Sequence, residues 1–350
     1  MFEVSNQVII PESQEVEVQQ VDRQKKNPGF FARFVRKLIK VLVISLISLI
    51  ILGTLAIIVV FHSPYTYLKE LYVTTAMATM DHQYLARIFV SEAEINQILK
   101  AYKMNPPTEY TNTGDITVRY KGSKDIQLIK VKGLTYKGYL LVVKDPSRVS
   151  IATTGKLGKK GMLVEDIVKD HKAVAGINAG GFLDEKGHGS GGIPLGVLIE
   201  NKKMLNPGSG EKQPLIGINK NNKLVLGNFT LKQIKRLNIR DAASFQPLLV
   251  INGKPQIKKG DGGQGIQPRT AIGQKKDGTM LFLVIDGRQV GSIGATLKDV
   301  QTIMLRYGAH NAANLDGGSS TTMIYKNDIV NNPCSSAGPR YVPSAFIVKK

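Results

Sequence analysis

The chain has 350 residues and a single cysteine, Cys334, which excludes an intrachain disulfide framework and a zinc site built from cysteines. Its 47 Lys and Arg residues outnumber 27 Asp and Glu residues, giving a formal net charge of +20 that suits an anionic partner. A solvated lysine-rich surface is the alternative explanation of this charge. We expect no nucleic-acid partner, because no zinc-finger, helix-turn-helix or RNP-like pattern is present.

The N-terminal part predicts a tail followed by a membrane anchor. Residues 1–30 are polar and of mixed charge, which is typical of a disordered tail. Segment 31–61 joins a basic cluster to an uncharged apolar run, 41–61. A helix of that length, at ~1.5 Å per residue, covers a hydrocarbon core of roughly 30 Å. The preceding cations predict a cytoplasmic N-terminus and an extracytoplasmic C-terminal domain.

A cleaved signal peptide is the alternative to this retained anchor. The apolar core of a signal peptide is normally ~7–15 residues long and lies near the chain start. Here the run is longer and begins about forty residues into the chain. The sequence therefore predicts a single-pass protein of the cell membrane.

Residues 63–114 predict a helical stalk or appendage. Pro64 is suited to a first helical turn, and Ser91 with Glu94 forms a capping-box pattern before an apolar periodicity. Residues 105–107, Asn-Pro-Pro, then interrupt the helical pattern.

Residues 115–350 predict an α+β domain with a mixed, largely antiparallel sheet and flanking helices. Runs rich in β-branched residues recur between Asn- and Gly-containing turns. The expected strands cover 126–131, 139–143, 215–218, 223–226, 247–251 and 280–285. Two amphipathic helices are expected at about 162–171 and 297–307, each leading into an apolar strand with a glycine-rich exit.

These strand exits are the candidate functional positions. The first exit, 176–182, contains Asn178 and Gly181, and the second, 313–320, has the sequence Ala-Asn-Leu-Asp-Gly-Gly-Ser-Ser. A strand end holds a side chain rigidly, and adjacent glycines let a ligand approach the backbone. The alternative is an ordinary tight turn in which Asp316 accepts N–H groups of its own loop.

Two further clusters have the same character. Segment 284–288 places Asp286 two residues before Arg288, and segment 268–273 places Arg269 and Thr270 at the start of a strand. Each is weak by itself, because an exposed arginine is usually only a solvated charge. Their recurrence within one domain favours a site.

Taken in order, the four segments resemble the phosphodiester glycosidase family. The resemblance covers roughly 126–349 and includes the tails 331–334 and 339–343. One departure is Asn-Ala-Gly-Gly-Phe at 178–182, where the family is expected to have Asn-Gly-Gly followed by an aromatic pair. The resemblance implies hydrolysis of a carbohydrate phosphodiester, in envelope polysaccharide or its precursors, to free sugar and a phosphomonoester.

On that chemistry, a phosphomonoester leaving group needs charge neutralisation more than a proton. Arg269 is the predicted phosphate clamp, with Arg288 second, because a guanidinium binds two phosphate oxygens. Asp316 is the predicted carboxylate at the anomeric centre, either activating water or stabilising an oxocarbenium-like transition state. Asp286 is its partner carboxylate or a residue that orients Arg269. Substrate contacts are expected from Asn178, Gly181, Thr270, Arg288, Gly317, Gly318, Ser319 and Ser320.

No cofactor is required by the sequence, although Asp286 and Asp316 could share a divalent cation. The five histidines lack the spacing of a catalytic zinc site, and His188 lies in a glycine-rich loop from which it could reach an active site. The alternative function is a non-catalytic protein that binds cell-wall glycan or acts as a scaffold in exopolysaccharide biosynthesis.

Overall fold

The computed structural model of the chain describes residues 29–79, 82–104, 108–184, 189–335 and 338–350. It divides into two compact units, Met1–Val59 and Val60–Lys350. The tail predicted for 1–30, apart from its last two residues, lies outside the described residues, as do the break at 105–107 and His188.

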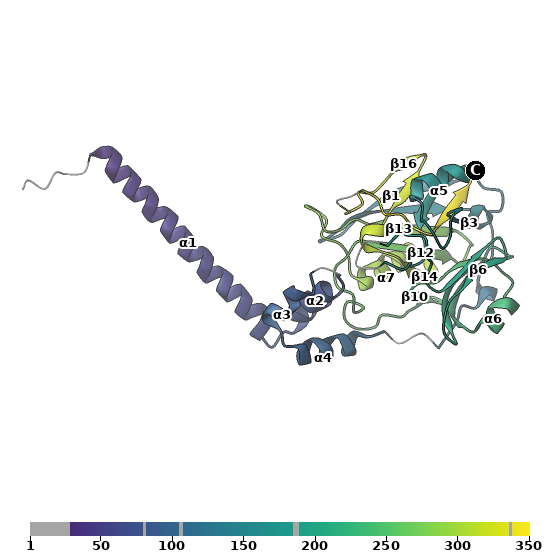
Figure 1. The fold of residues 1–350 in the computed structure, drawn as a ribbon, viewed down its shortest axis with the longest axis horizontal. Helices are drawn as coiled ribbons and strands as arrows, with labels where there is room; N and C mark the ends of the chain where they lie inside the picture. Colours follow the sequence, from purple (N-terminus) through teal and green to yellow (C-terminus); the bar gives the residue numbers. More distant parts are fainter. Residues whose placement is uncertain (1–28, 80–81, 105–107, 185–188, 336–337) are drawn as a thin grey trace, which may run out of the picture. The chain divides into compact units, whose positions relative to one another are not determined.

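A 33-residue helix, α1 (Phe30–His62), contains the apolar run and the basic cluster that precedes it (Figure 1). Its most apolar 18-residue window has a mean hydropathy of 3.0, and none of that window is buried. Within the part of the chain that the structure describes, this is the one helix long and apolar enough to cross a membrane. Length and composition alone are consistent with either a signal sequence or an anchor.

Three short helices form a small cluster of their own: α2 (Tyr67–Met77), α3 (Tyr84–Phe89) and α4 (Glu92–Tyr102). Val73, Ala86 and Ile95 are fully buried between them. The hydroxyl of Ser91 accepts the N–H of Glu94 at 3.3 Å, so the capping pattern does begin α4. The predicted helical character of this region is confirmed.

The rest of the second unit contains three antiparallel sheets. The largest has seven strands in the order β1-β2-β13-β12-β14-β10-β11, and all its neighbours pair antiparallel. The strands are β1 (Ile126–Lys132), β2 (Lys137–Val143), β10 (Leu248–Ile251), β11 (Lys254–Pro255), β12 (Arg269–Lys275), β13 (Met280–Ile285) and β14 (Ala309–Leu315).

The other two sheets have five strands each. The order β16-β15-β4-β17-β3 joins β3 (Val149–Thr153), β4 (Ala173–Asn178), β15 (Met323–Tyr325), β16 (Asp328–Ile329) and β17 (Ser344–Lys349). The order β6-β5-β9-β7-β8 joins β5 (Val197–Glu200), β6 (Lys203–Pro207), β7 (Gln213–Asn219), β8 (Leu224–Phe229) and β9 (Ile239–Ala243).

One hydrophobic core is shared by the three sheets. Phe282 from the first sheet, Phe346 from the second and Ile216 from the third are fully buried in it. Burial of such large apolar side chains is the main favourable contribution to folding, roughly 1.5–3 kcal/mol for each. The predicted α+β class with largely antiparallel sheets is therefore confirmed.

Each sheet also packs against a helix. On the seven-stranded sheet lies α7 (Leu297–Arg306), on the second sheet α5 (Val164–Asp170), and on the third α6 (Leu231–Arg236). Two of these helices match the amphipathic segments predicted from the sequence, whereas α6 was not predicted. Short 3₁₀ turns complete the order: η1 (Thr113–Asp115), η2 (Pro146–Arg148) and η4 (Gly318–Ser320).

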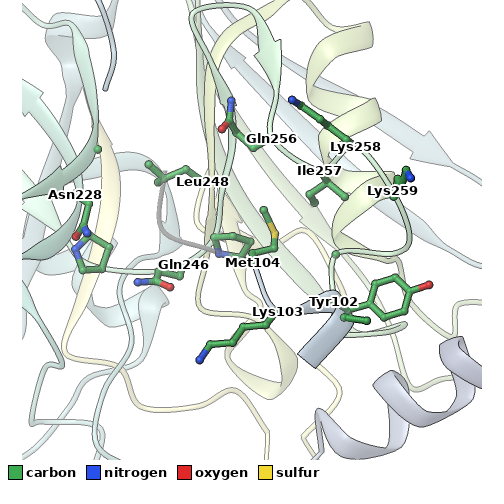
Figure 2. A pocket seen from close by; sticks show the side chains of 15 residues that line it. Tyr102, Lys103, Met104, Asn228, Gln246, Leu248, Gln256, Ile257, Lys258 and Lys259 are labelled. Atoms are coloured by element: carbon green, nitrogen blue, oxygen red, sulfur yellow. The ribbon is translucent and has the colours of Figure 1, made fainter. Parts of the chain in front are cut away.

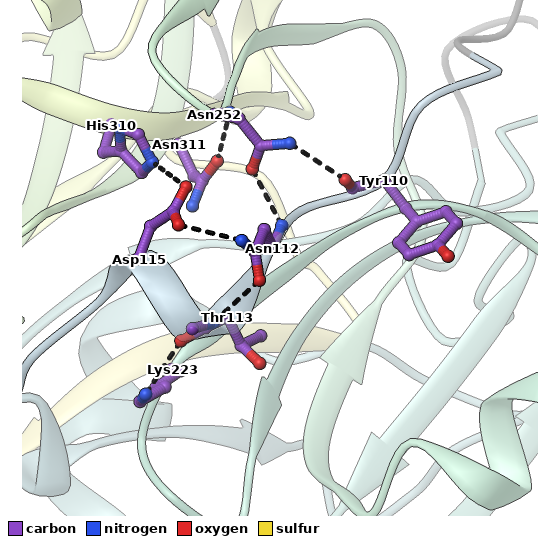
Figure 3. A network of polar contacts seen from close by, with 9 residues as sticks. Tyr110, Asn112, Thr113, Asp115, Lys223, Asn252, His310 and Asn311 are labelled. Carbon is purple, nitrogen blue, oxygen red and sulfur yellow. Dashed lines mark hydrogen bonds and ion pairs between the residues drawn. The ribbon is translucent and has the colours of Figure 1, made fainter.

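A polar network fastens the segment before β1 to the sheets (Figure 3). Asp115 lies 3.1 Å from His310 of β14 and accepts the side-chain N–H of Asn112 at 2.8 Å. Asn252, in the turn after β10, accepts the backbone N–H of Asn112 at 2.8 Å, and Lys223 donates to the Thr113 carbonyl at 2.7 Å. The contacts with His310, Asn252 and Lys223 join sequence positions more than a hundred residues apart, whereas the bond between Asn112 and Asp115 is local.

Candidate active site

The register of the central strands brings the predicted clusters to one edge of the largest sheet, formed by the start of β12 and the ends of β13 and β14. In that sheet β12 lies between β13 and β14, with Arg269 opposite Ile285 and Thr270 opposite Leu315. The next residues, Asp286 after β13 and Asp316 after β14, therefore leave the sheet on either side of the start of β12. This pairing could not be read from the sequence.

Asn178, at the end of β4, ties the second sheet to this edge. Its side-chain N–H donates to the Asp316 carbonyl at 2.6 Å. Its side-chain oxygen accepts the Thr270 hydroxyl at 2.9 Å and the Thr322 N–H at 3.1 Å. Both Asn178 and Thr270 have no exposed surface, so in this structure they hold the backbone that carries Asp316.

The turn after β14 is shaped by its two glycines. Gly318 has a φ of 58° and donates its N–H to the Pro268 carbonyl at 2.9 Å. A Cβ on Gly317 would lie 2.8 Å from the same carbonyl oxygen, too close for any side chain. The turn thus lies directly on the entrance of β12, with Ser319 partly exposed and Ser320 buried.

Asp316 has the most perturbed carboxyl of this region. Burial raises its pKa to about 7, against the lowering effects of a hydrogen bond from Ser320, the charge of Arg340 and the N–H of Gly317, whereas the charge of Asp184 raises it further. The side chain is nevertheless partly exposed. Because both its forms are populated near neutral pH, this carboxyl can exchange a proton with a bound reactant.

Arg340 and Asp184 form an ion pair beside this turn that was not assigned a role from the sequence. The guanidinium lies 2.9 Å from the Asp184 carboxylate and 5.5 Å from the centre of the Phe182 ring. Gly189 donates its N–H to the same carboxylate at 2.8 Å. Neighbouring Gly181 is buried and donates to the Ser244 carbonyl at 3.4 Å, which makes it part of the supporting backbone.

Asp286 has a different environment, although it too follows a strand and precedes a glycine. It is 8% exposed, and one carboxylate oxygen accepts the side-chain N–H of Asn331 at 3.1 Å and the N–H of Asn332 at 2.8 Å. Burial raises its pKa, and these two hydrogen bonds lower it. Its hydrogen bonds thus hold the loop after β16, instead of orienting Arg269.

The guanidinium of Arg269 is hydrogen-bonded mainly within the protein. It is 3% exposed and donates to the Ala295 carbonyl at 3.1 Å, to the Gln264 side chain at 2.8 Å, and to the Gln264 and Gly265 carbonyls at 3.0 and 2.7 Å. Burial lowers its pKa to about 9, which leaves it cationic at neutral pH. To bind a phosphate group of a substrate, Arg269 would have to break some of these hydrogen bonds and form new ones with the phosphate oxygens.

Arg288 is the accessible arginine of the predicted pair. It is exposed, has a φ of 58°, and both its Nε and Nη2 donate to the Gln267 side-chain oxygen at 3.1 and 2.5 Å. Its Nη2 lies 3.6 Å from the position that a Cβ on Gly318 would occupy. The guanidinium therefore reaches the turn that follows Asp316.

Both arginines are bound by one loop, 261–267, and helix α2 holds that loop. The Thr74 hydroxyl donates to Asp261 at 2.7 Å, and the same carboxylate oxygen accepts the Gly265 N–H at 2.9 Å. The Thr75 hydroxyl accepts the Ile266 N–H at 3.0 Å. No motif in the sequence indicated these contacts.

Among the described residues, no group of three or more His, Cys, Asp and Glu side chains is arranged to hold a metal ion. The cation that Asp286 and Asp316 could share therefore remains a sequence-based prediction.

Comparison with known proteins places this fold in a class. The catalytic domain of zebrafish N-acetylglucosamine-1-phosphodiester alpha-N-acetylglucosaminidase, solved in a form auto-inhibited by its pro-peptide, has a similar fold with a TM-score of 0.56. It is 22% identical, over 69% of this chain and 88% of that one. The chain thus has the fold of a glycosidase catalytic domain.

Residues 171–349 match the phosphodiester glycosidase family, and the chain belongs to that family. The bovine N-acetylglucosamine-1-phosphodiester alpha-N-acetylglucosaminidase is 23% identical over 218 residues, covering 56% of this chain. The SPbeta prophage-derived uncharacterized protein YomE of Bacillus subtilis is 34% identical over 96 residues, covering 27% of this chain. The chain matches only 40% and 15% of the lengths of these two relatives.

Proposed function

We propose that this protein hydrolyses the glycosidic bond of sugar-1-phosphodiesters, with Asp316 as the carboxylate at the anomeric centre. The observation that carries the proposal is the partly exposed Asp316 carboxyl, whose pKa burial raises to about 7 at the open end of β14. A group that titrates near the working pH is best suited to move a proton in the reaction. Family membership supports this reaction class.

In the proposed step Asp316 acts as a general base. A water molecule attacks the anomeric carbon and gives one proton to the Asp316 carboxylate, while its oxygen becomes the new hydroxyl of the sugar. The bond between the anomeric carbon and the phosphate oxygen breaks, and the phosphomonoester leaves with the electron pair. Because this leaving group is already a weak base, no second carboxylic acid is needed to protonate it, unlike in an ordinary glycosidase.

Arg288 neutralises the charge that grows on the leaving phosphate. Its guanidinium is exposed and reaches the Gly318 position, and such a fork binds two phosphate oxygens at once. The partly exposed Ser319 contacts a sugar hydroxyl in this proposal. In this proposal Asn178, Thr270, Asp286 and Arg269 position the reacting groups through the contacts described above, instead of touching the substrate.

We further propose that α1 is retained as an anchor and that the catalytic domain works outside the cytoplasmic membrane on envelope polysaccharide or its precursors. Support comes from the basic cluster at its start, which includes Arg33, Arg36, Lys37 and Lys40, and from the 33-residue apolar helix. Protease added to intact cells should degrade the C-terminal domain, and the mass of the membrane-extracted protein should include residues 1–61. A mature chain that begins after residue 61 would identify a cleaved signal peptide instead.

The reaction is tested with the detergent-solubilised chain and the methyl diester of N-acetylglucosamine-1-phosphate. Free sugar and methyl phosphate should form in equal amounts, with and without a chelator, and should be lost in Asp316→Asn. Formation of sugar-1-phosphate would mean that the other bond is cut, by a phosphodiesterase. Retention on glycan without any product, across several sugars, would favour the binding or scaffold function.

A further inference from the structure

A pocket of 330 Å³ lies between the end of α4, strands β7 and β8, and the segments 246–248 and 256–259 (Figure 2). One wall is the end of α4 with Lys103 and Met104, and the other contains Gln246, Leu248 and the segment 256–259. Figure 2 shows Met104, Leu248 and Ile257 at its centre, with amide and lysine side chains around them. The pocket combines an apolar floor with a polar rim.

The charged side chains that line this pocket are all positive. Three of its fifteen lining residues are exposed lysines (Lys103, Lys258 and Lys259), and none of the fifteen is acidic. A second pocket, of 570 Å³, is different, because Arg240 there lies 2.7 Å from Asp241 and His171 lies 3.9 Å from Glu200. The 330 Å³ pocket thus offers positive charge that its own lining does not neutralise, which favours an anionic ligand.

This pocket extends to the loop 261–267, which binds both arginines. An adjoining cavity of 240 Å³ shares six lining residues with it and extends to Gln264, whose side chain accepts from Arg269 at 2.8 Å. The shared wall at Gln246 and Pro247 is bonded to β14, since the carbonyls of both residues accept N–H groups of Asn314, at 3.1 and 3.0 Å. Asn314 lies two residues before Asp316.

The wall that comes from α4 precedes the part of the chain that matches the family, 171–349. This wall belongs to the cluster of helices α2, α3 and α4. Thr74 and Thr75 of α2 form hydrogen bonds with the loop 261–267 and so hold the cluster in place. The Tyr102 hydroxyl also donates to Glu70 of α2. The pocket therefore includes residues from outside the segment that matches the family.

We propose that the pocket binds a phosphate-bearing segment of a polymeric substrate, on the leaving-group side of the scissile bond. This proposal rests on the proposed function, whose leaving group is a phosphomonoester. The lysines contact phosphate oxygens of a repeating polyol phosphate, the amides of Gln246 and Gln256 contact hydroxyls, and Met104 and Ile257 contact its carbon chain. Each lysine contact is a screened surface interaction, so binding weakens as salt rises.

The kinetic test compares two substrates on the full chain in detergent. One is the methyl diester, which ends at the scissile phosphate, and the other carries a glycerol-phosphate oligomer in place of methyl. The double variant Lys258→Ala, Lys259→Ala should raise KM for the oligomer by about 10-fold and leave kcat for the oligomer unchanged. For the methyl diester, both KM and kcat should be unchanged. Equal effects on both substrates, or no effect on the oligomer, would overturn the proposal.

Two exposed lysines on α6, Lys232 and Lys235, give the matched control. Their replacement by alanine removes the same charge at positions that do not line the pocket, and should leave KM for the oligomer within about 2-fold of the wild-type value. A control that matches the pocket variant would mean that only the overall charge matters.

Direct binding separates this proposal from the hydrolytic one. A glycerol-phosphate hexamer without any sugar is titrated calorimetrically into the wild type, the pocket variant and the α6 control. Binding that only the pocket variant loses would support the site even if no substrate is hydrolysed. Absence of binding would overturn it even if the methyl diester is cleaved. Equal affinity for glycerophosphoglycerol, the headgroup of an anionic lipid, would also overturn it, because the site would then take one phosphodiester and no polymer.

Discussion

The turns after β13 and β14 share the dipeptide Asp-Gly, yet they place their carboxylates in different environments. Asp286 is 8% exposed and its oxygen is bound by Asn331 and Asn332. Asp316 is partly exposed beside Ser320 and Arg340, and burial raises its pKa to about 7. The dipeptide determines a turn in both cases, whereas the partners that tertiary packing supplies determine which carboxyl is available for chemistry.

The two arginines of this edge differ in the same way. Arg269 begins β12 and donates four hydrogen bonds to the loop and to Ala295, so its guanidinium is bound within the protein interior. Arg288 follows β13, is exposed, and donates from Nε and Nη2 to the Gln267 side-chain oxygen. One carboxylate and one arginine are thus buried and hydrogen-bonded within the protein, whereas Asp316 and Arg288 have exposed surface.

The largest effect is expected from Asp316→Asn, which keeps the shape of the side chain but removes the proton acceptor. We expect kcat to fall by about 10²–10⁴-fold, the usual contribution of a general base, while circular dichroism shows a folded protein. Asp286→Asn is the matched control and should keep kcat within about 3-fold, because the amide oxygen can still accept from Asn331 and Asn332. Equal losses in the two variants would abolish the distinction between the two turns.

Arg288→Gln should lower kcat/KM by about 10–100-fold, which corresponds to a charge-assisted hydrogen bond of roughly 1.5–3 kcal/mol. The loss should be smaller for a substrate whose leaving group carries less charge.

Arg269→Gln provides the contrast, because it leaves loop carbonyls without their buried donors. We expect the free energy of unfolding to fall by about 3 kcal/mol, measured by urea denaturation. If Arg269→Gln were as stable as the wild type and lost activity selectively, Arg269 would be the phosphate clamp and Arg288 would not.

The raised pKa of Asp316 also predicts how stability depends on pH. The folded state binds this proton up to about pH 7 and the unfolded state only to about pH 4, so folding becomes less favourable as pH rises through this interval. Asp316→Asn removes the ionisable group and should be more stable than the wild type at pH 8, by about 2 kcal/mol after allowing for partial exposure. At pH 3.5 the two proteins should be equally stable.

Activity should have the opposite dependence on pH. Since the base must be ionised, kcat/KM for the methyl diester should rise with pH to a plateau, with a midpoint near 7. A kcat/KM that falls through the same midpoint would assign Asp316 the role of general acid.

The sequence predicted the parts of this molecule that depend on local patterns. Apolar periodicity identified α7, which begins after the capping residue Thr296, and the β-rich run at 280–285 became β13 as expected. The final motif, with its carboxylate and two glycines, could be recognised because Gly317 and Gly318 meet backbone that tolerates no side chain or requires a positive φ. Such local constraints are visible in a single segment.

Contacts between distant segments could not be predicted in this way. The donors of Arg269 go mainly to backbone carbonyls, which every residue has, so no residue type marks them. Thr74 and Asp261 meet across 187 positions, and neither lies in a recognisable motif. The sequence therefore indicated which residues belong to the edge of the sheet. It did not indicate which of them are buried and hydrogen-bonded to other parts of the protein.

The smallest effect is expected at this contact between α2 and the arginine-binding loop. Thr74→Val keeps the side-chain shape and removes the hydroxyl that donates to Asp261 at 2.7 Å. The variant should be less stable by about 1–2 kcal/mol, because Asp261 is buried and loses a partner. It should also lower kcat by a few-fold, since the same loop carries Gln267, the partner of Arg288. Thr302→Val, on the exposed face of α7, makes the same replacement without a partner in the loop and should change neither quantity. A Thr74→Val protein with wild-type stability and kcat would mean that α2 lies against the catalytic domain without positioning its arginines.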